Sequence, residues 1–246
     1  MAGSLQAQDF GNALTFTSGP DYVEAPAANL LNEVDQFTIE LWAKFDAVGG
    51  FGVIVGKMLS GNPRIDLQFN QDARLLAVLD GTIATSSTFI VTDEWYHLAY
   101  VYDGTQPIPQ NRIRLFINGL EESLTFNPQE VPAITEASSA PLRIGTYFNN
   151  GFHSAGTYDE LRIWSIPRTQ AEIQSAMNTT LSGNESGLEA YYKFDEMGST
   201  TTLPDLTSNG YNGTLVGLQV HPGLRLVPAY RVQSVMVQGL TFLAMK

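Results

Sequence analysis

Apolar and polar residues alternate along most of the chain with the period of two that is typical of β-strands. In residues 37–45 the alternate positions are apolar and would share one face of a strand: Phe37, Ile39, Leu41, Ala43 and Phe45. Trp42 is an apolar residue on the opposite face. Short segments of similar pattern recur at 52–56, 65–69, 75–79, 95–102, 112–117, 142–145, 158–164 and 188–194.

Turn signals separate these segments. Asp80-Gly81 and Asn118-Gly119 are the kind of pair that supplies the positive φ angles of tight hairpins. Short strands at this spacing predict an all-β sandwich or barrel. One short helix is predicted at 169–177, where Thr169 and Glu172 have the spacing of a capping box.

The composition excludes several classes of partner and chemistry. The chain carries 13 Lys and Arg against 25 Asp and Glu, a formal net charge of -12. Phosphate groups would be repelled, so nucleic acid and anionic membranes are not expected partners. There is no cysteine, which excludes disulfides, thiolate nucleophiles and cysteine-ligated metals. No run approaches 18 apolar residues, so no membrane insertion is expected.

The two ends of the sequence differ from the rest. Residues 1–9 have the character of an added or processed remnant, and the expected domain spans 10–217. Low lysine and absent cysteine favour a secreted or cell-surface bacterial protein, with a cytosolic protein as the alternative. Residues 218–246 form a β-prone, basic tail that is too short to be a domain. The tail would pair with this domain's sheet, with a second copy, or with a further domain.

Six motifs follow one another along the chain. They lie at 13–26, at 37–45, at 94–104 paired with 113–119, at 142–145, at 158–173, and at 187–196 continuing through 205–215. Together they resemble the laminin-G-like and pentraxin-like domains of the concanavalin A-like lectin/glucanase superfamily. The resemblance implies an all-β fold, a two-sheet antiparallel jelly-roll sandwich with one short helix, often with one bound calcium ion.

The sequence lacks the motifs of hydrolytic enzymes. Glycoside hydrolysis needs two carboxylates at a fixed separation. Catalytic members of the resembling superfamily carry Glu-x-Asp-x-Glu on one strand, which does not occur here. Asp159 and Glu160 are adjacent, so a regular strand would point them to opposite faces. His97 lies among apolar residues and is interpreted as a core histidine. The protein is therefore expected not to be an enzyme.

The resemblance also implies a structural calcium site. Calcium binds six to eight oxygen atoms from carboxylates, carbonyls and water. Gly19 would supply a carbonyl oxygen, Asp21 a carboxylate from the same turn, and Asp159 a second carboxylate from a later strand. The alternative is that Asp21 only closes its turn and that Asp159 pairs with Arg162 or Arg168.

The segment 145–154 is the predicted ligand-binding loop. It contains Tyr147, Phe148, Asn149, Asn150, Phe152 and His153. We expect Tyr147, Asn149, Asn150 and Phe152 to bind a ligand, because aromatic rings stack on sugars and amides bind hydroxyl groups. The alternative is a loop whose aromatic side chains pack against the edge of a sheet.

Three hypotheses for the function remain open, because a fold does not by itself decide what a protein does. The first is a non-catalytic extracellular binding or adhesion module that recognises a glycan or a cell-surface protein. The second is a structural subunit that self-associates into a filament or oligomer through its C-terminal strand. The third is an accessory domain of a polysaccharide-degrading enzyme.

Overall fold

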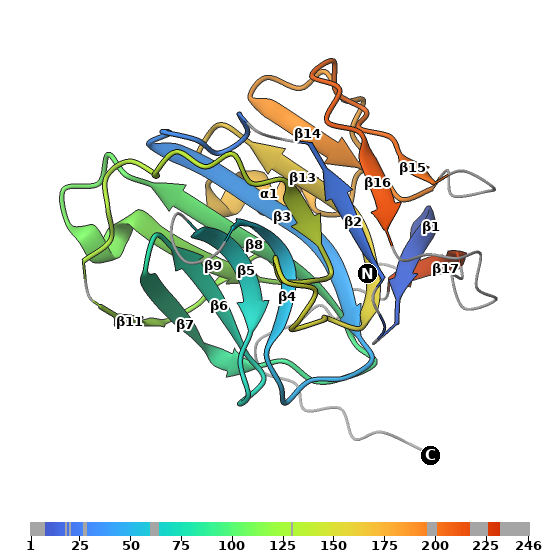
Figure 1. The fold of residues 1–246 in the computed structure, drawn as a ribbon, viewed down its shortest axis with the longest axis horizontal. Coiled ribbons are helices and arrows are strands. Elements are labelled where there is room, and N and C mark those ends of the chain that lie inside the picture. Colours follow the sequence, from blue (N-terminus) through green and yellow to red (C-terminus); the bar gives the residue numbers. More distant parts are fainter. Residues whose placement is uncertain are drawn as a thin grey trace, which may run out of the picture.

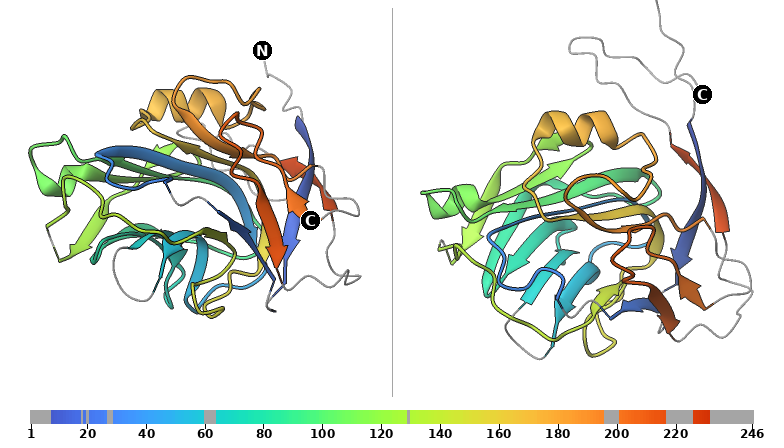
Figure 2. Two further views of the ribbon diagram at one scale, coloured as in Figure 1. Left: turned by 45° about the horizontal axis from the view of Figure 1, so that its top comes forward. Right: turned by 90° about the horizontal axis from the view of Figure 1, so that it is seen from above.

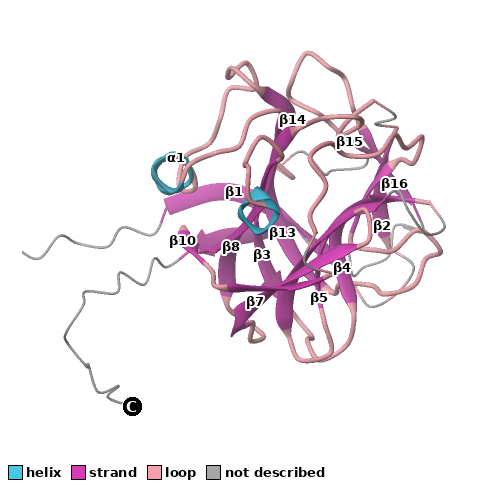
Figure 3. Cartoon of the chain, turned by 90° about the vertical axis from the view of Figure 1, so that its left-hand side faces the viewer, coloured by secondary structure: helices cyan, strands magenta, loops and turns pink. Residues whose placement is uncertain are grey.

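Two antiparallel β-sheets lie face to face in the computed structural model, which confirms the predicted sandwich (Figures 1 and 2). The structure describes residues 8–17, 19, 21–26, 29–59, 64–128, 130–195, 201–216 and 226–231. Strands and loops make up nearly all of this part of the chain (Figure 3). None of its helices is long and apolar enough to cross a membrane.

Sheet A has eight strands in the described part of the chain. Its strands, in spatial order, are β10 (Leu120–Glu121), β9 (Ile113–Ile117), β8 (Trp95–Asp103), β3 (Gln36–Phe45), β13 (Gly156–Trp164), β1 (Gln8–Phe16) and β17 (Leu226–Arg231), and β14 (Leu188–Tyr192) also pairs with β13.

Sheet B has nine strands in the same described residues. In spatial order they are β11 (Leu124–Asn127), β7 (Thr82–Phe89), β6 (Arg74–Leu79), β5 (Arg64–Phe69), β4 (Gly52–Met58), β12 (Leu142–Ile144), β2 (Tyr22–Ala25), β16 (Gly213–Val216) and β15 (Thr202–Leu203).

The core lies between the two sheets, where the alternating apolar residues meet. The five positions predicted to share one face of β3 all belong to the core: Phe37, Ile39, Leu41, Ala43 and Phe45. Across the interior, the ring of Phe45 meets that of Phe69 on β5, with centroids 5.3 Å apart. Burying a side chain of this kind stabilises the fold by about 1.5–3 kcal/mol. The side chains at the outward positions of both sheets therefore do not belong to this core.

Two hairpins form where the sequence predicted them. Asp80 and Gly81, with φ angles of 43° and 95°, connect β6 to β7. Asn118 and Gly119, with φ angles of 53° and 73°, connect β9 to β10. Positive φ at both central residues gives a turn whose twist matches that of the paired strands.

The predicted helix is α1 (Gln170–Ala176), which covers the outer face of sheet A (Figure 2). Thr169 is its N-cap, and both hydrogen bonds of the capping box with Glu172 are present. Ile173 on the inner side of α1 packs against Val101 and Phe116 from β8 and β9. A helix this short depends on such packing, because isolated short helices are marginal in water.

The described part of the C-terminal tail joins this domain's own sheet. β17 pairs antiparallel with β1, with Gln8 opposite Arg231 and Leu14 opposite Leu226. Of the three destinations considered for the tail, residues 226–231 take the first. Residues 1–7, 217–225 and 232–246 lie outside the described residues.

Candidate functional site

A pocket of about 230 Å³ opens on the outer face of sheet B. Its lining comes from three neighbouring strands and two loops: Arg64 and Gln68 on β5, Leu76 on β6, Ile83 on β7, and the aromatic residues Phe51, Tyr147 and Phe152. Residues Ile65, Leu67 and Phe69 of β5 lie in the core, so the strand's alternate residues point outward into this pocket.

Arg143 on β12 holds the loop 145–154 against the outer face of sheet B. Its Nη1 donates hydrogen bonds to the carbonyl oxygens of Tyr147 at 3.2 Å and Phe148 at 2.5 Å. Its Nη2 pairs with the Glu24 carboxylate at 2.8 Å. On the other side of the loop, the Val53 N–H donates to the Phe152 carbonyl at 2.9 Å. The loop therefore carries its aromatic side chains over β5.

Three aromatic rings form the wall of the pocket. The ring of Phe152 contacts Phe51 at a centroid distance of 5.6 Å and Tyr147 at 5.3 Å, both edge to face. Phe51 is 40% exposed and Phe152 is 48% exposed. Phe152 also has a φ of +49°, which is strained for a bulky residue. Phe152 thus combines a half-exposed ring with a strained backbone.

The polar side of the pocket is an arginine between a buried carboxylate and an aromatic ring. The Arg64 guanidinium pairs with Asp66, which is fully buried, and lies 5.2 Å from the centre of the Tyr147 ring. Its Nη2 also donates to Gln68 Oε1 at 3.3 Å. Burial raises the pKa of Asp66 to about 6, and the positive charge of Arg64 opposes that rise.

The apolar floor of the pocket consists of Leu76 and Ile83. Both occupy outward positions of sheet B, where polar residues would be expected beside water. Sequence reasoning did not select these two residues, nor Arg64 and Gln68. A signal was present, because residues 75–79 are apolar without interruption, which predicts a strand covered on both faces.

The structure separates the four predicted ligand-binding residues into two pairs. Tyr147 and Phe152 line the pocket. Asn149 and Asn150 do not: Asn149 Oδ1 accepts from the Gly151 N–H at 3.0 Å, and Asn150 Oδ1 accepts from Arg143 at 3.1 Å. The two amides shape the loop, while the two aromatic residues face the pocket.

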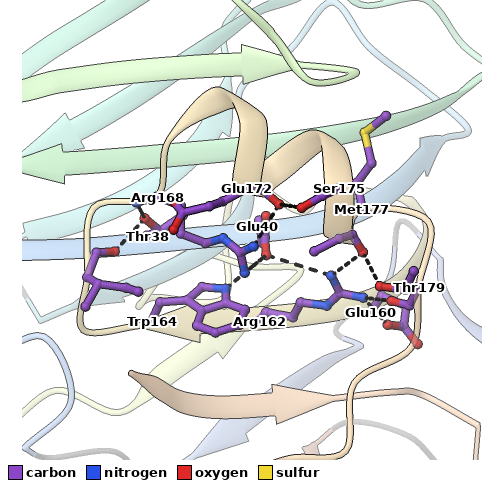
Figure 4. Close-up of polar contacts among 12 residues, drawn as sticks. Thr38, Glu40, Glu160, Arg162, Trp164, Arg168, Glu172, Ser175, Met177 and Thr179 are labelled. Carbon is purple, nitrogen blue, oxygen red and sulfur yellow. Dashed lines mark hydrogen bonds and ion pairs between the residues drawn. The ribbon is translucent and has the colours of Figure 1, made fainter. Parts of the chain in front are cut away.

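A network of buried charges lies on the outer face of sheet A, beneath α1 (Figure 4). Glu40 Oε1 accepts from Trp164 Nε1 at 2.9 Å and from Arg168 Nη1 at 3.3 Å. Arg162 pairs with Glu160 at 2.5 Å and donates to the Ala176 carbonyl at the end of α1 at 3.0 Å. These charged side chains are almost fully buried, so the network binds α1 to the sheet and leaves no room for a ligand.

A wider depression of about 640 Å³ lies at the edge of the sandwich near β9, β10 and β11. Two of its carboxylates are already bonded within the protein: Asp103 accepts from Gln106 Nε2 at 2.6 Å, and Glu122 accepts from the Thr88 hydroxyl at 2.9 Å. Phe126 is its one aromatic lining residue among those described. The smaller pocket on sheet B has three aromatic residues in its lining.

Comparison with known proteins identifies the family. A laminin-G sequence model, described as the concanavalin A-like lectin/glucanases superfamily, matches residues 17–174. The chain belongs to this superfamily. The match confirms the resemblance that the motifs indicated. No curated protein sequence matches the chain.

Solved structures share the superfamily fold with this chain. A proposed carbohydrate-binding protein from Bacteroides ovatus is 21% identical with a TM-score of 0.70, and the match covers 92% of this chain and 62% of that one. The chain thus spans less than two thirds of that protein's length. The CBM40 module of a Ruminococcus gnavus IT-sialidase, bound to α2,3-sialyllactose, is 11% identical with a TM-score of 0.50. That match covers 70% of this chain and 98% of the module.

Two of the calcium ligands that the superfamily resemblance implied lie on separate segments of the chain, Asp21 just before β2 and Asp159 within β13. Asp21 Oδ2 accepts a hydrogen bond from the Thr17 hydroxyl at 2.6 Å, as a residue that closes a turn would. Asp159 lies three positions along β13 from Gly156, which pairs with Phe16 at the end of β1. No group of three or more acidic or histidine side chains suited to a metal occurs in the described part of the chain. The calcium ion, with Gly19 as a carbonyl ligand, stays a prediction.

Asp159 and Glu160 on β13 do not alternate as the sequence predicted. Regular alternation would point Asp159 and Glu160 to opposite faces, but the pairing of β13 with β3 shifts between Asp159 and Arg162. Tyr158 and Leu161, three positions apart, both lie in the core, so the two acidic residues between them do not alternate. Glu160 nevertheless pairs with Arg162 and accepts from the Tyr191 hydroxyl at 2.8 Å, which commits it to the buried network.

Proposed function

We propose that this protein is a non-catalytic carbohydrate-binding module that holds a sugar in the pocket on sheet B. The observation that carries the proposal is the pocket itself, where exposed aromatic rings stand beside Arg64 and Gln68. Aromatic faces stack on the C–H groups of a sugar, and a few polar groups fix its orientation. We place this activity outside the cell, as the composition led us to expect.

The lining of the pocket supports binding without catalysis. Among the described residues that line it there is no aspartate or glutamate. The carboxylate of Asp66, between Arg64 and Gln68 on β5, is buried and engaged by Arg64. Glycoside hydrolysis by paired carboxylates would need two acids facing the substrate, roughly 5–10 Å apart.

Structural relatives support a glycan in preference to a protein ligand. The Bacteroides ovatus protein is itself a proposed carbohydrate-binding protein, and the CBM40 module was solved with a sialylated sugar. The alternative of a structural subunit assembled by strand exchange has less support, because residues 226–231 already pair with β1 of the same chain.

A glycan array followed by calorimetric titration tests the proposal. We expect the chain to bind at least one class of glycan and Phe152→Ala to weaken that binding by about tenfold or more, because the exposed wall of the pocket is lost. Phe89→Ala is the matched control: Phe89 is 55% exposed and lies against Arg74, outside the pocket lining. Absence of binding across the array, or equal affinity of both variants, would overturn the proposal.

A further inference from the structure

We propose that the pocket on sheet B selects sugars that carry a neutral N-acetyl group. The inference rests on the proposed function of the same pocket, and it names the class of sugar. It follows from three features: which hydrogen-bonding groups remain available, how charge is balanced, and where the apolar surface lies.

The available polar group of Gln68 is a donor. Its Oε1 lies 3.3 Å from Arg64 Nη2. A guanidinium can only donate, so the amide oxygen must face Arg64 and the amide NH₂ must point away from it. Gln68 is 5% exposed, and its Nε2 has no hydrogen-bond partner among the residues that the structure describes. A ligand that bonds to this donor must bring an acceptor oxygen.

The charge of Arg64 is already balanced. Asp66 is fully buried against the guanidinium and holds it at the polar side of the pocket. A ligand carboxylate would place a second negative charge beside Asp66, in a chain whose formal net charge is -12. Like charges brought together away from water are disfavoured. A neutral acceptor, such as an amide carbonyl, therefore fits better than the carboxylate of an acidic sugar.

The apolar floor lies beside this donor. Gln68 pairs in register with Leu76 on the adjacent strand β6, and Ile83 on β7 pairs with Val78. An acetamido group carries a carbonyl oxygen and a methyl group on the same carbon atom, which matches a donor next to an aliphatic surface. A sugar hydroxyl at the same position would satisfy the donor but would leave Leu76 and Ile83 without an apolar partner.

Calorimetric titration of the full chain with methyl glycosides tests the inference. We expect N-acetylglucosamine or N-acetylgalactosamine to bind about tenfold or more tightly than the matched glucose or galactose, because both a buried methyl and an accepted hydrogen bond are gained. Glucuronic acid should bind no better than glucose. An N-acetyl sugar that binds no more tightly than its parent hexose, or a uronic acid that binds best, would overturn the inference.

Variants at Gln68 separate this inference from the proposed function. Gln68→Leu and Gln68→Glu both remove the amide donor, and each should abolish the preference for the N-acetyl sugar while thermal unfolding confirms a folded chain. Gln71→Glu, exposed in the turn after β5, makes the same charge change outside the pocket lining and should keep the preference.

If hexoses and N-acetyl sugars bind equally but Phe152→Ala still weakens both, the inference fails and the proposed function stands. If N-acetyl sugars bind and Phe152→Ala has no effect, the pocket is not the binding site and both fail.

Discussion

The outer face of each sheet carries a buried carboxylate paired with an arginine. The helix α1 covers the pair on sheet A, and the loop 145–154 covers the pair on sheet B. On sheet A, Glu40 lies against Arg168 beneath α1, with Trp164 as a further donor. On sheet B, Asp66 lies against Arg64 beneath the ring of Tyr147. Each carboxylate is fully buried and each is held by a guanidinium.

The element that covers each ion pair decides whether the pair is sealed or lies beside a pocket. The helix α1 is capped by Thr169 and packed through Ile173, and it covers an ion network whose charged side chains are almost fully buried. The loop 145–154 reaches only part of the way across sheet B and leaves a pocket beside Arg64. A helix thus seals the buried ion pair on sheet A, whereas the loop on sheet B leaves a pocket beside the other pair.

The largest expected effect comes from breaking the sealed network. Glu40→Ala should lower the free energy of unfolding by about 3–5 kcal/mol, because Arg162 and Arg168 would be left buried without their shared carboxylate. Urea denaturation measures this, with Glu130→Ala as a control at an exposed position. A loss smaller than about 1 kcal/mol would show that the network contributes little to stability.

The pair on sheet B should make stability depend on pH. Burial raises the pKa of Asp66 to about 6, so the folded chain keeps this proton at pH values where the unfolded chain has lost it. Stability contributed through Asp66 should therefore fall as the pH rises from about 4 to about 6, by at most about 3 kcal/mol, and then level off.

Asp66→Asn isolates this contribution from those of the other carboxylates. The difference in unfolding free energy between the wild type and Asp66→Asn should change between pH 4 and pH 6 and stay constant from pH 6.5 to pH 8. Two curves that run parallel across the whole range would contradict a raised pKa for Asp66.

Loss of the N-cap of α1 should have an intermediate effect on the free energy of unfolding. Thr169→Ala removes the side-chain acceptor of the capping box and should lower the free energy of unfolding by about 1 kcal/mol. Thr180→Ala, at an exposed position beyond α1, is the matched control. Equal stability of the two variants would mean that the capping box does not stabilise α1 on sheet A.

The smallest expected effect on stability comes from a substitution in the pocket on sheet B. Phe152→Gly should change the free energy of unfolding by no more than about 1 kcal/mol, because relief of the strained φ of +49° offsets the lost ring contacts and the greater freedom of an unfolded glycine. The same variant should lose glycan affinity as Phe152→Ala does. A loss of stability above about 2 kcal/mol would assign Phe152 to the fold instead.

Local patterns in the sequence predicted much of the fold and part of the site. The alternation at 37–45 identified the core face of β3, and the spacing of Thr169 and Glu172 identified the start of α1. From the aromatic loop 145–154, Tyr147 and Phe152 line the pocket, and their role in ligand binding stays a prediction. These features depend on side chains close together in the chain, so the sequence is enough to find them.

The rest of the pocket depends on contacts between distant segments. Gln68, Leu76 and Ile83 meet only because β5, β6 and β7 pair in one particular register, and the ring of Tyr147 reaches them only because Arg143 ties its loop across the sheet. The shifted pairing of β13 around Glu160 is likewise a property of two strands together.

The sequence by itself therefore determined the class of fold, the two-sided pattern of its strands and the aromatic character of one loop. Each of these features depends on residues that are close together in the sequence. Only the tertiary structure decided which of two buried ion pairs is sealed and which opens on a pocket. The physical reason is that the register of strand pairing and the reach of a helix or a loop across a sheet are set by the packing of the whole domain.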